Sequence, residues 1–234
     1  MASRAGHSMD VWLASLLILL AAGAIVGASI EGLRWLHYLC KPAATLVIIV
    51  RALQGARGPY RRWLLVGLVL SLGGDICLML PIDAFVAGLA AFLLAHVAYI
   101  CALRHGVRLS ALCMTAPVLA IYAGGNLFGL WPHLPDSLRM PVIAYTVVLA
   151  SMAAMAFARA LKPPRGARRG TGLAALGALL FVASDSLLAW DRFAGPLPWA
   201  TAGLLASYYA AQWCLASSTP AASSLAYRVY ARGR

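Results

Sequence analysis

Long apolar stretches alternate with short polar ones along the whole chain. Each apolar stretch runs for about 18 to 23 residues, the length that an α-helix needs to cross the hydrocarbon core of a bilayer. The pattern predicts an all-α polytopic membrane protein with eight transmembrane helices, at approximately residues 11–30, 36–53, 63–80, 84–103, 109–130, 138–160, 170–190 and 197–217. The first stretch is longer than a typical signal-peptide core and lacks a clear cleavage site, so we expect it to remain as a helix.

Short connections join these stretches, and 62% of the 234 residues are hydrophobic. Such a composition excludes a soluble globular domain. We therefore expect a single membrane domain over residues 1–234, folded as one compact bundle and ending in a basic tail from residue 218.

The formal net charge of +12 comes largely from cations in alternate connections. The connections after the third, fifth and seventh stretches instead hold Asp83, Asp136 and Asp191. Because cytoplasmic loops carry an excess of lysine and arginine, this asymmetry places both termini in the cytoplasm. We expect the basic loops to contact membrane lipids with anionic headgroups, not nucleic acid. The cations concerned are Arg57, Arg61, Arg62, Arg104, Arg108, Lys162, Arg165, Arg168, Arg169, Arg228, Arg232 and Arg234.

Two carboxyl groups lie inside apolar stretches: Asp75 in the third and Asp185 in the seventh. A charged residue within a membrane helix is costly, so each should face the interior of the bundle or a wet cavity. Asp75 precedes Pro81 by six residues and Asp185 precedes Asp191 by six, which puts both about 9 Å below the outer end of their helices. The pair predicts two carboxyls at matching depth. The alternative is that each only hydrogen-bonds a neighbouring helix.

Asp75 and Asp185 also belong to a weak internal sequence repeat. Gly67, Asp75 and Tyr99 recur as Gly177, Asp185 and Tyr209, each displaced by 110 residues. One hypothesis is that two helical hairpins, each with its own aspartate, face one another across one cavity.

Other polar residues could serve the same cavity. Lys41 precedes Pro42 about one turn inside the second stretch, where it either extends to the interface or binds an anion such as a phosphate. In the fourth stretch, Phe92, His96 and Tyr99 share one helical face. Asn126, Tyr145, Tyr208, Gln212 and Asp191 are further candidates, although hydrogen bonding within the bundle would also explain them.

Several kinds of chemistry fit the sequence poorly. There is no His-x-x-x-His or Cys-x-x-Cys pair for a metal, no Gly-x-Ser-x-Gly for a serine hydrolase, and no P-loop or dinucleotide fingerprint. The five cysteines all fall within the apolar stretches without paired spacing, as packing residues do. Carboxylate chemistry remains. In such a buried pair one member can stay protonated as a general acid while the other stays ionised, which suits a reaction through an oxocarbenium ion.

These residues together resemble the YhhN family, which includes the lysoplasmalogenases. The resemblance is carried by Lys41-Pro42, Gly74-Asp75, Phe92-x-x-x-His96-x-x-Tyr99, Ser184-Asp185-Ser186 with Phe193 beyond, and Tyr208-Tyr209-Ala-Ala-Gln212. It implies eight membrane helices and hydrolysis of the vinyl ether bond of lysoplasmalogens, which gives a fatty aldehyde and glycerophospho-ethanolamine or -choline. No cofactor is implied.

The resemblance also implies roles for residues. Asp75 and Asp185 would be the acid and the stabilising carboxylate, in an order that the sequence leaves open. Lys41 would hold the phosphate of a lysophospholipid. His96, Asn126, Tyr145 and Tyr208 would orient water or the headgroup. We expect an integral protein of the bacterial cytoplasmic membrane, and the sequence predicts no oligomeric state.

Two alternatives belong to other classes. Buried aspartate and lysine also mark proton-coupled sites, so a small transporter or lipid-handling protein remains possible. An intramembrane aspartyl protease also uses two membrane aspartates, but its Gly-x-Gly-Asp signature is broken here by Leu72, and Ser184 stands where that family has tyrosine.

Overall fold

The computed structural model describes residues 2–80, 82, 84–164 and 166–219, with side chains from Ser8 onward. Within these ranges the chain is almost wholly helical, which confirms the predicted all-α fold. The helices are α1 (Ala2–Ser29), α2 (Arg34–Leu53), α3 (Pro59–Met79), α4 (Phe85–Leu103), α5 (Leu109–Leu130), α6 (Asp136–Leu161), α7 (Arg168–Phe193) and α8 (Ala200–Ser217), with short 3-10 helices at Glu31–Leu33 and Trp131–His133.

Seven of the eight helices, α1 to α7, are long and apolar enough to cross a membrane. The exception, α8, has 18 residues and carries Tyr208, Tyr209 and Gln212. All three side chains are buried, so the polarity of α8 faces the bundle and not the lipid. We count α8 as the eighth helix of the bundle because it packs against α7, α2 and α1, although its hydropathy is lower than that of the other seven helices.

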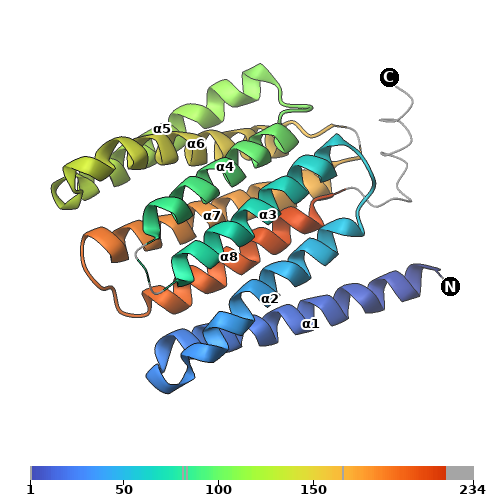
Figure 1. Ribbon diagram of the computed structural model, residues 1–234. Helices are drawn as coiled ribbons and strands as arrows, with labels where there is room; N and C mark the ends of the chain where they lie inside the picture. The colour runs from blue at the N-terminus through green and yellow to red at the C-terminus, as the bar shows by residue number, and fades with distance from the viewer. Residues whose placement is uncertain (1, 81, 83, 165, 220–234) are drawn as a thin grey trace.

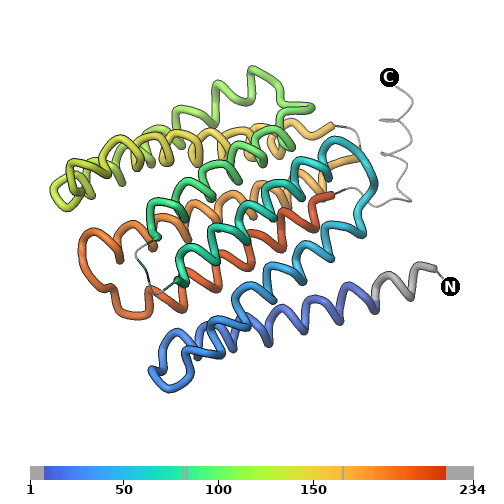
Figure 2. Tube along the Cα trace, in the orientation of Figure 1, coloured from blue at the N-terminus to red at the C-terminus, as the bar shows by residue number. Residues whose placement is uncertain are grey.

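The helices run antiparallel in chain order, with α1 and α2 on one side of the bundle and α5 and α6 on the other (Figure 1). Sequential helices pack in pairs, α1 on α2, α3 on α4, α5 on α6 and α7 on α8. Between these pairs, α2 contacts α3 and α8, while α6 contacts α4 and α7. The trace in Figure 2 shows α3, α4, α7 and α8 in the middle of the bundle, and α3 and α7 carry the two buried aspartates.

Glycines let α4 approach α3 closely. A Cβ atom on Gly67 would overlap the ring of Tyr99, and one on Gly74 would lie 2.6 Å from the ring of Phe92. Small residues at membrane helix interfaces allow such close packing, where van der Waals contact supplies much of the association energy. Because Tyr99 and Phe92 are both buried, this packing fixes the inner face of α4 next to Asp75.

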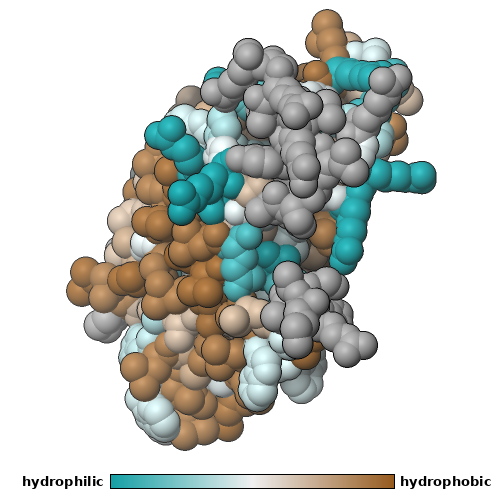
Figure 3. All heavy atoms as spheres, turned by 90° about the vertical axis from the view of Figure 1, so that its right-hand side faces the viewer, coloured by the Kyte–Doolittle hydropathy of each residue, from teal (hydrophilic) through white to brown (hydrophobic). Residues whose placement is uncertain are grey.

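One end of the bundle gathers the basic connections. The start of α1, the end of α8, and the α2–α3, α4–α5 and α6–α7 connections all lie at this end (Figure 1). Figure 3, which looks onto it, shows hydrophilic side chains at this end and hydrophobic ones along the flanks. The expectations for Pro81, Asp83, Arg165 and the basic tail beyond residue 219 lie outside the described residues.

The orientation of this end is a testable prediction. We expect single cysteines introduced at Arg57 or Lys162 to resist labelling by an impermeant maleimide added outside intact cells, because the positive-inside rule places them in the cytoplasm. A cysteine at Arg139, at the start of α6, should label readily. The unmodified protein is the control, since its five cysteines all lie within helices. The reverse labelling pattern would invert the topology.

Candidate active site

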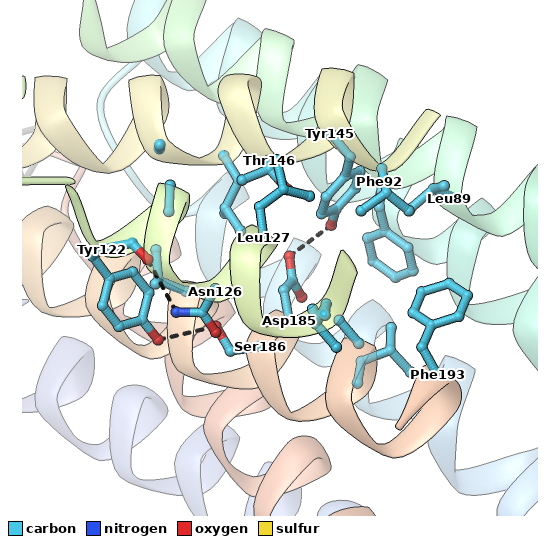
Figure 4. Close-up of a pocket in the computed structure, with 18 of the residues that line it drawn as sticks. Leu89, Phe92, Tyr122, Asn126, Leu127, Tyr145, Thr146, Asp185, Ser186 and Phe193 are labelled. Carbon is cyan, nitrogen blue, oxygen red and sulfur yellow. Dashed lines mark hydrogen bonds between the residues drawn. The ribbon is translucent and has the colours of Figure 1, made fainter. Parts of the chain in front are cut away.

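A largely apolar pocket lies between α4, α5, α6 and α7, with Leu78 of α3 at its edge (Figure 4). Its volume is about 80 Å³. Apart from Asp185, its polar lining consists of hydroxyl and amide groups, those of Tyr122, Asn126, Tyr145, Thr146 and Ser186. Its mostly apolar lining suits an apolar chain with one reactive group near the carboxyl.

Among the described residues, Asp185 is the only aspartate, glutamate, lysine, arginine or histidine that lines this pocket. Its Oδ2 atom accepts a hydrogen bond of 2.6 Å from the hydroxyl of Tyr145, which reaches across from α6. The two side chains point toward one another in Figure 4. The hydrogen bond from Tyr145 restrains the direction of the carboxyl group. The Asp185 side chain is 12% exposed and lines the pocket.

His96 lies directly behind this pair. Its Nε2 atom is 3.8 Å from Asp185 Oδ2, which is too long for a hydrogen bond. The ring is 1% exposed and contacts Phe181 and Tyr145 edge-on, with centroid distances of 5.1 and 5.4 Å. Neither ring nitrogen makes a hydrogen bond within the described part of the chain. Because buried polar atoms are normally paired, these nitrogens suit a water molecule or a shift toward Asp185.

Asp75 has very different surroundings. Its Oδ2 atom accepts hydrogen bonds from Thr45 Oγ1 at 2.8 Å and from the Tyr208 hydroxyl at 2.7 Å. Its Oδ1 atom lies 3.5 Å from the ammonium of Lys41, and the carboxyl side chain is only 2% exposed. Three donors from α2 and α8 thus converge on a carboxylate that does not line the pocket described above.

The Asp75 contacts continue as a chain of buried hydrogen bonds. Gln212 donates to the Tyr208 hydroxyl at 2.7 Å and accepts from Tyr99 at 3.0 Å. Tyr99 in turn lies 3.2 Å from Ser71 Oγ. This network joins α2, α3, α4 and α8, and every polar group in it has a partner, as a stable membrane interior requires.

Aromatic rings separate the two carboxyl groups. Phe92 lines the pocket and packs edge-on against Tyr208, the donor to Asp75, at 5.8 Å. Phe181 contacts both His96 and Tyr208. The structure thus brings the predicted residues together in two adjoining groups. Asp185, Tyr145 and Asn126 line the pocket, whereas Asp75, Lys41, Tyr208 and Gln212 form the network behind it.

Two of the predicted site residues, Asn126 and Asp191, form hydrogen bonds that stabilise the fold. The Asn126 side chain donates to the carbonyl of Tyr122 and accepts from the Trp190 indole at 3.1 Å, which ties α5 to α7. Asp191 Oδ1 accepts from the backbone N–H of Leu197 at 2.8 Å and so closes the α7–α8 connection. Asp191 does not line the pocket.

Sequence reasoning missed the roles of several polar residues of these groups, namely Thr45, Ser71, Tyr122, Thr146 and Ser186. Thr45 lies four residues after Lys41, so helical spacing would have put both on one face. Tyr122 and Ser186 meet at 3.0 Å across α5 and α7, and both line the pocket. Ser186 belongs to the Ser184-Asp185-Ser186 motif, and Tyr122 lies about one helical turn before Asn126, so both stand next to predicted site residues.

Comparison with known proteins agrees with these features. The YhhN family model matches residues 36–219. Lysoplasmalogenase TMEM86B of Sus scrofa is 38% identical over 178 residues, which cover 74% of this chain and 70% of that protein. The human protein of the same name is 36% identical over 189 residues, 78% of this chain and 74% of its own. A lysoplasmalogenase of Mycobacterium bovis is 37% identical over 174 residues, 71% of this chain and 64% of its own.

No solved structure matches the chain. The family match begins at the third residue of α2 and runs past the end of α8, so it includes both aspartates and all the predicted site residues. The resemblance seen in the motifs is therefore confirmed, and this chain belongs to the YhhN family.

Proposed function

We propose that this protein hydrolyses the vinyl ether bond of lysoplasmalogens, releasing a fatty aldehyde and a glycerophospho-ethanolamine or -choline. The observation that carries the proposal is Asp185, a carboxyl held by Tyr145 at an apolar pocket inside a bundle of membrane helices. An apolar pocket takes the alkenyl chain, and a single carboxyl beside it supplies the proton that the reaction needs. The relatives named lysoplasmalogenase support this substrate class.

The surroundings of the two aspartates support different roles. Asp75 faces an ammonium and two hydroxyl donors, all of which stabilise a carboxylate. Asp185 receives one hydroxyl donor, and among the described residues no lysine or arginine lies within salt-bridge distance of it. We therefore assign the proton-donating role to Asp185 and keep Asp75 as the ionised partner.

The reaction then follows from the enol ether. Asp185 transfers its proton to the vinyl carbon that is not bonded to oxygen, and the electron pair of the double bond forms the new C–H bond. The ether oxygen shares the resulting positive charge as an oxocarbenium ion beside the newly formed carboxylate. Water adds to the carbon bonded to oxygen and gives a proton back to Asp185. The hemiacetal collapses to the aldehyde and the free hydroxyl of the glycerol.

Other residues near Asp185 orient the reactants. The Tyr145 hydroxyl fixes one carboxylate oxygen, so the other oxygen is directed at the substrate. His96, behind the carboxyl with unpaired ring nitrogens, can hold the water molecule once the pocket is occupied. Asp75 acts indirectly, because it holds Tyr208 against Phe92, which forms part of the pocket wall.

Deuterium incorporation tests this mechanism. In heavy water with rapid trapping, we expect aldehyde that carries one deuterium at its α-carbon, because the proton added to the vinyl carbon comes from solvent by way of Asp185. Turnover should also be slower than in ordinary water, since transfer to carbon is slow and involves the acid. Mass spectrometry of the trapped aldehyde measures both. Aldehyde without deuterium would refute carbon protonation.

A transporter reading is supported by the buried Lys41–Asp75 pair, since such pairs also occur at proton-coupled sites. An assay of aldehyde release by purified protein in detergent distinguishes a hydrolase from a transporter. An enzyme converts its substrate there without an ion gradient. Failure to release aldehyde from lysoplasmalogen would favour transport. We place the protein in a bacterial cytoplasmic membrane, where its substrate would be a lysophospholipid of the bilayer.

A further inference from the structure

The apolar pocket is too small to hold a whole alkenyl chain. Its volume is about 80 Å³, whereas a cavity of about 150 Å³ binds a single benzene molecule. The pocket has room for the vinyl ether beside Asp185 and for a few further carbon atoms. The rest of a long chain must lie elsewhere, and the surroundings that suit it are the hydrocarbon core of the bilayer.

The thinnest wall between the pocket and the lipid is the middle of α5, residues 116–129. This helix lies at the edge of the bundle (Figure 1), where it packs along α6 and contacts α7 much less. None of residues 116–129 is fully buried. Tyr122 is 45% exposed and also lines the pocket, so at this point the wall is one side chain thick. We call residues 116–129 the wall segment.

Two hydrogen bonds close the seam between the wall segment and α7. The hydroxyls of Tyr122 and Ser186 lie 3.0 Å apart, next to Asp185 in the chain (Figure 4). One turn further along, the Trp190 indole donates to Asn126 at 3.1 Å. Hydrogen bonds between membrane helices contribute little stability on average. These two can therefore hold the seam closed without locking it.

The wall segment is fixed at both of its ends. Before it, Thr115 donates to the carbonyl of Ala154 in α6 at 2.9 Å. After it, Leu130 is buried in a small apolar cluster with Leu134 and Val142. Any movement of α5 away from α7 would therefore be an outward bend between two fixed points.

The residues of the wall segment favour such a bend. Pro117 lies inside the helix and has no N–H for the bond to the carbonyl of Cys113, and helices kink most readily at such a point. Gly124 and Gly125 follow, and both lower the stability of the helix relative to alanine. A Cβ atom on either glycine would meet open space, so packing does not explain their lack of a side chain.

We propose that the alkenyl chain leaves the pocket between α5 and α7 and continues into the bilayer, and that the wall segment bends outward to let it pass. The inference rests on the proposed function and specifies how its site takes a long chain. The pocket would then bind the vinyl ether end of the chain, while the bilayer solvates the remainder.

Stiffening the wall segment tests this route. For Gly124→Ala combined with Gly125→Ala we expect KM for a long-chain lysoplasmalogen to rise about five- to tenfold with kcat nearly unchanged, because two better helix formers resist the bend. Neither glycine lines the pocket and the added methyl groups meet open space, so the thermal unfolding midpoint should not fall. Gly172→Ala is the matched control. Gly172 lies in α7 with open space around it, and its substitution should leave KM unchanged.

Trp190→Phe should act in the opposite direction. It removes the donor to Asn126, and Trp190 does not line the pocket. Since this bond then need not break when the chain binds, KM for the long-chain substrate should fall about threefold, the effect of one average hydrogen bond between membrane helices. A lysoplasmalogen with a propenyl chain fits inside the pocket, so its KM should be the same in every variant. Equal changes of KM for both chain lengths, or for neither, would refute the route while the hydrolase stood.

Photolabelling locates the chain without turnover. The probe is a lysophospholipid with a saturated ether-linked chain, which has no vinyl group to protonate, and with a diazirine midway along that chain. We expect label in the wall segment and on α7, and competition by excess lysoplasmalogen. Label confined to α4 and α6 would overturn the route. Absence of aldehyde release from lysoplasmalogen by the wild-type protein would instead refute the proposed function.

Discussion

Asp185→Asn is expected to lose nearly all aldehyde release, by about 10²- to 10⁴-fold in kcat, because the amide cannot donate a proton to carbon as a general acid does. The variant should still fold, since asparagine keeps the shape of the side chain and its oxygen can still accept from Tyr145. The measurement is the initial rate of aldehyde formation by purified protein, together with its thermal unfolding midpoint.

Asp136→Asn is the matched control for Asp185→Asn. Its side chain is 87% exposed and pairs with Arg139 on the surface, so turnover should stay at the wild-type level. Tyr145→Phe should give a smaller loss than Asp185→Asn, because it removes only the group that orients the acid. An Asp185→Asn protein that kept half of its activity would return Asp185 to a structural role.

Lys41→Met is expected to be the most destabilising of the single substitutions considered. It leaves Asp75 as an uncompensated charge in an interior where its side chain is 2% exposed, and breaking a buried pair in this way typically costs about 3–5 kcal/mol. Lys41→Met combined with Asp75→Asn removes both charges and should recover most of that loss. Thermal unfolding of the single and double variants in detergent measures the coupling between them.

Asp10→Asn supplies the comparison for this ion pair. Asp10 pairs with Arg51 at 3.2 Å, but its side chain is 45% exposed, so its loss should cost at most about 1 kcal/mol. We expect the Lys41→Met and Asp75→Asn double variant to fold yet to turn over slowly, because Tyr208 loses the ionised acceptor that holds it against Phe92. If the stability lost in the double variant equalled the sum of the two single losses, the two charges would not interact.

The course of the helices could be predicted from apolar length alone. The fifth stretch, 109–130, agrees with α5 at both ends. Two helices begin at residues other than those predicted, and in each case a local interaction or backbone conformation explains the difference. The first stretch was expected to start at residue 11, but α1 continues back through Asp10, whose charge is met by Arg51. The eighth was expected from residue 197, but Trp199 adopts a left-handed conformation with φ of 65°, so α8 begins at Ala200.

The sequence predicts which residues belong to the site better than it predicts how they divide into a pocket around Asp185 and a buried network around Asp75. Both aspartates were found because charges in apolar helices are costly. Their partners depend on which helices become neighbours, and the repeat of 110 residues does not specify this. Asp75 is bound from α2 and α8, whereas Asp185 is bound from α6. The pocket accordingly contains one carboxyl, although the repeat suggested two facing a common cavity.

The apolar pocket shares Leu78 and Phe85 with a second, more open pocket at the end of α3, and this junction also affects how the products separate. Hydrolysis would cut the substrate near the boundary between an apolar compartment and one open to water. The aldehyde then partitions into the bilayer and the glycerophosphodiester diffuses into solution. Recombination would need both fragments in the pocket at once, so dilution into two phases pulls the reaction forward. A protein built in this way needs no coupled energy source to run in one direction.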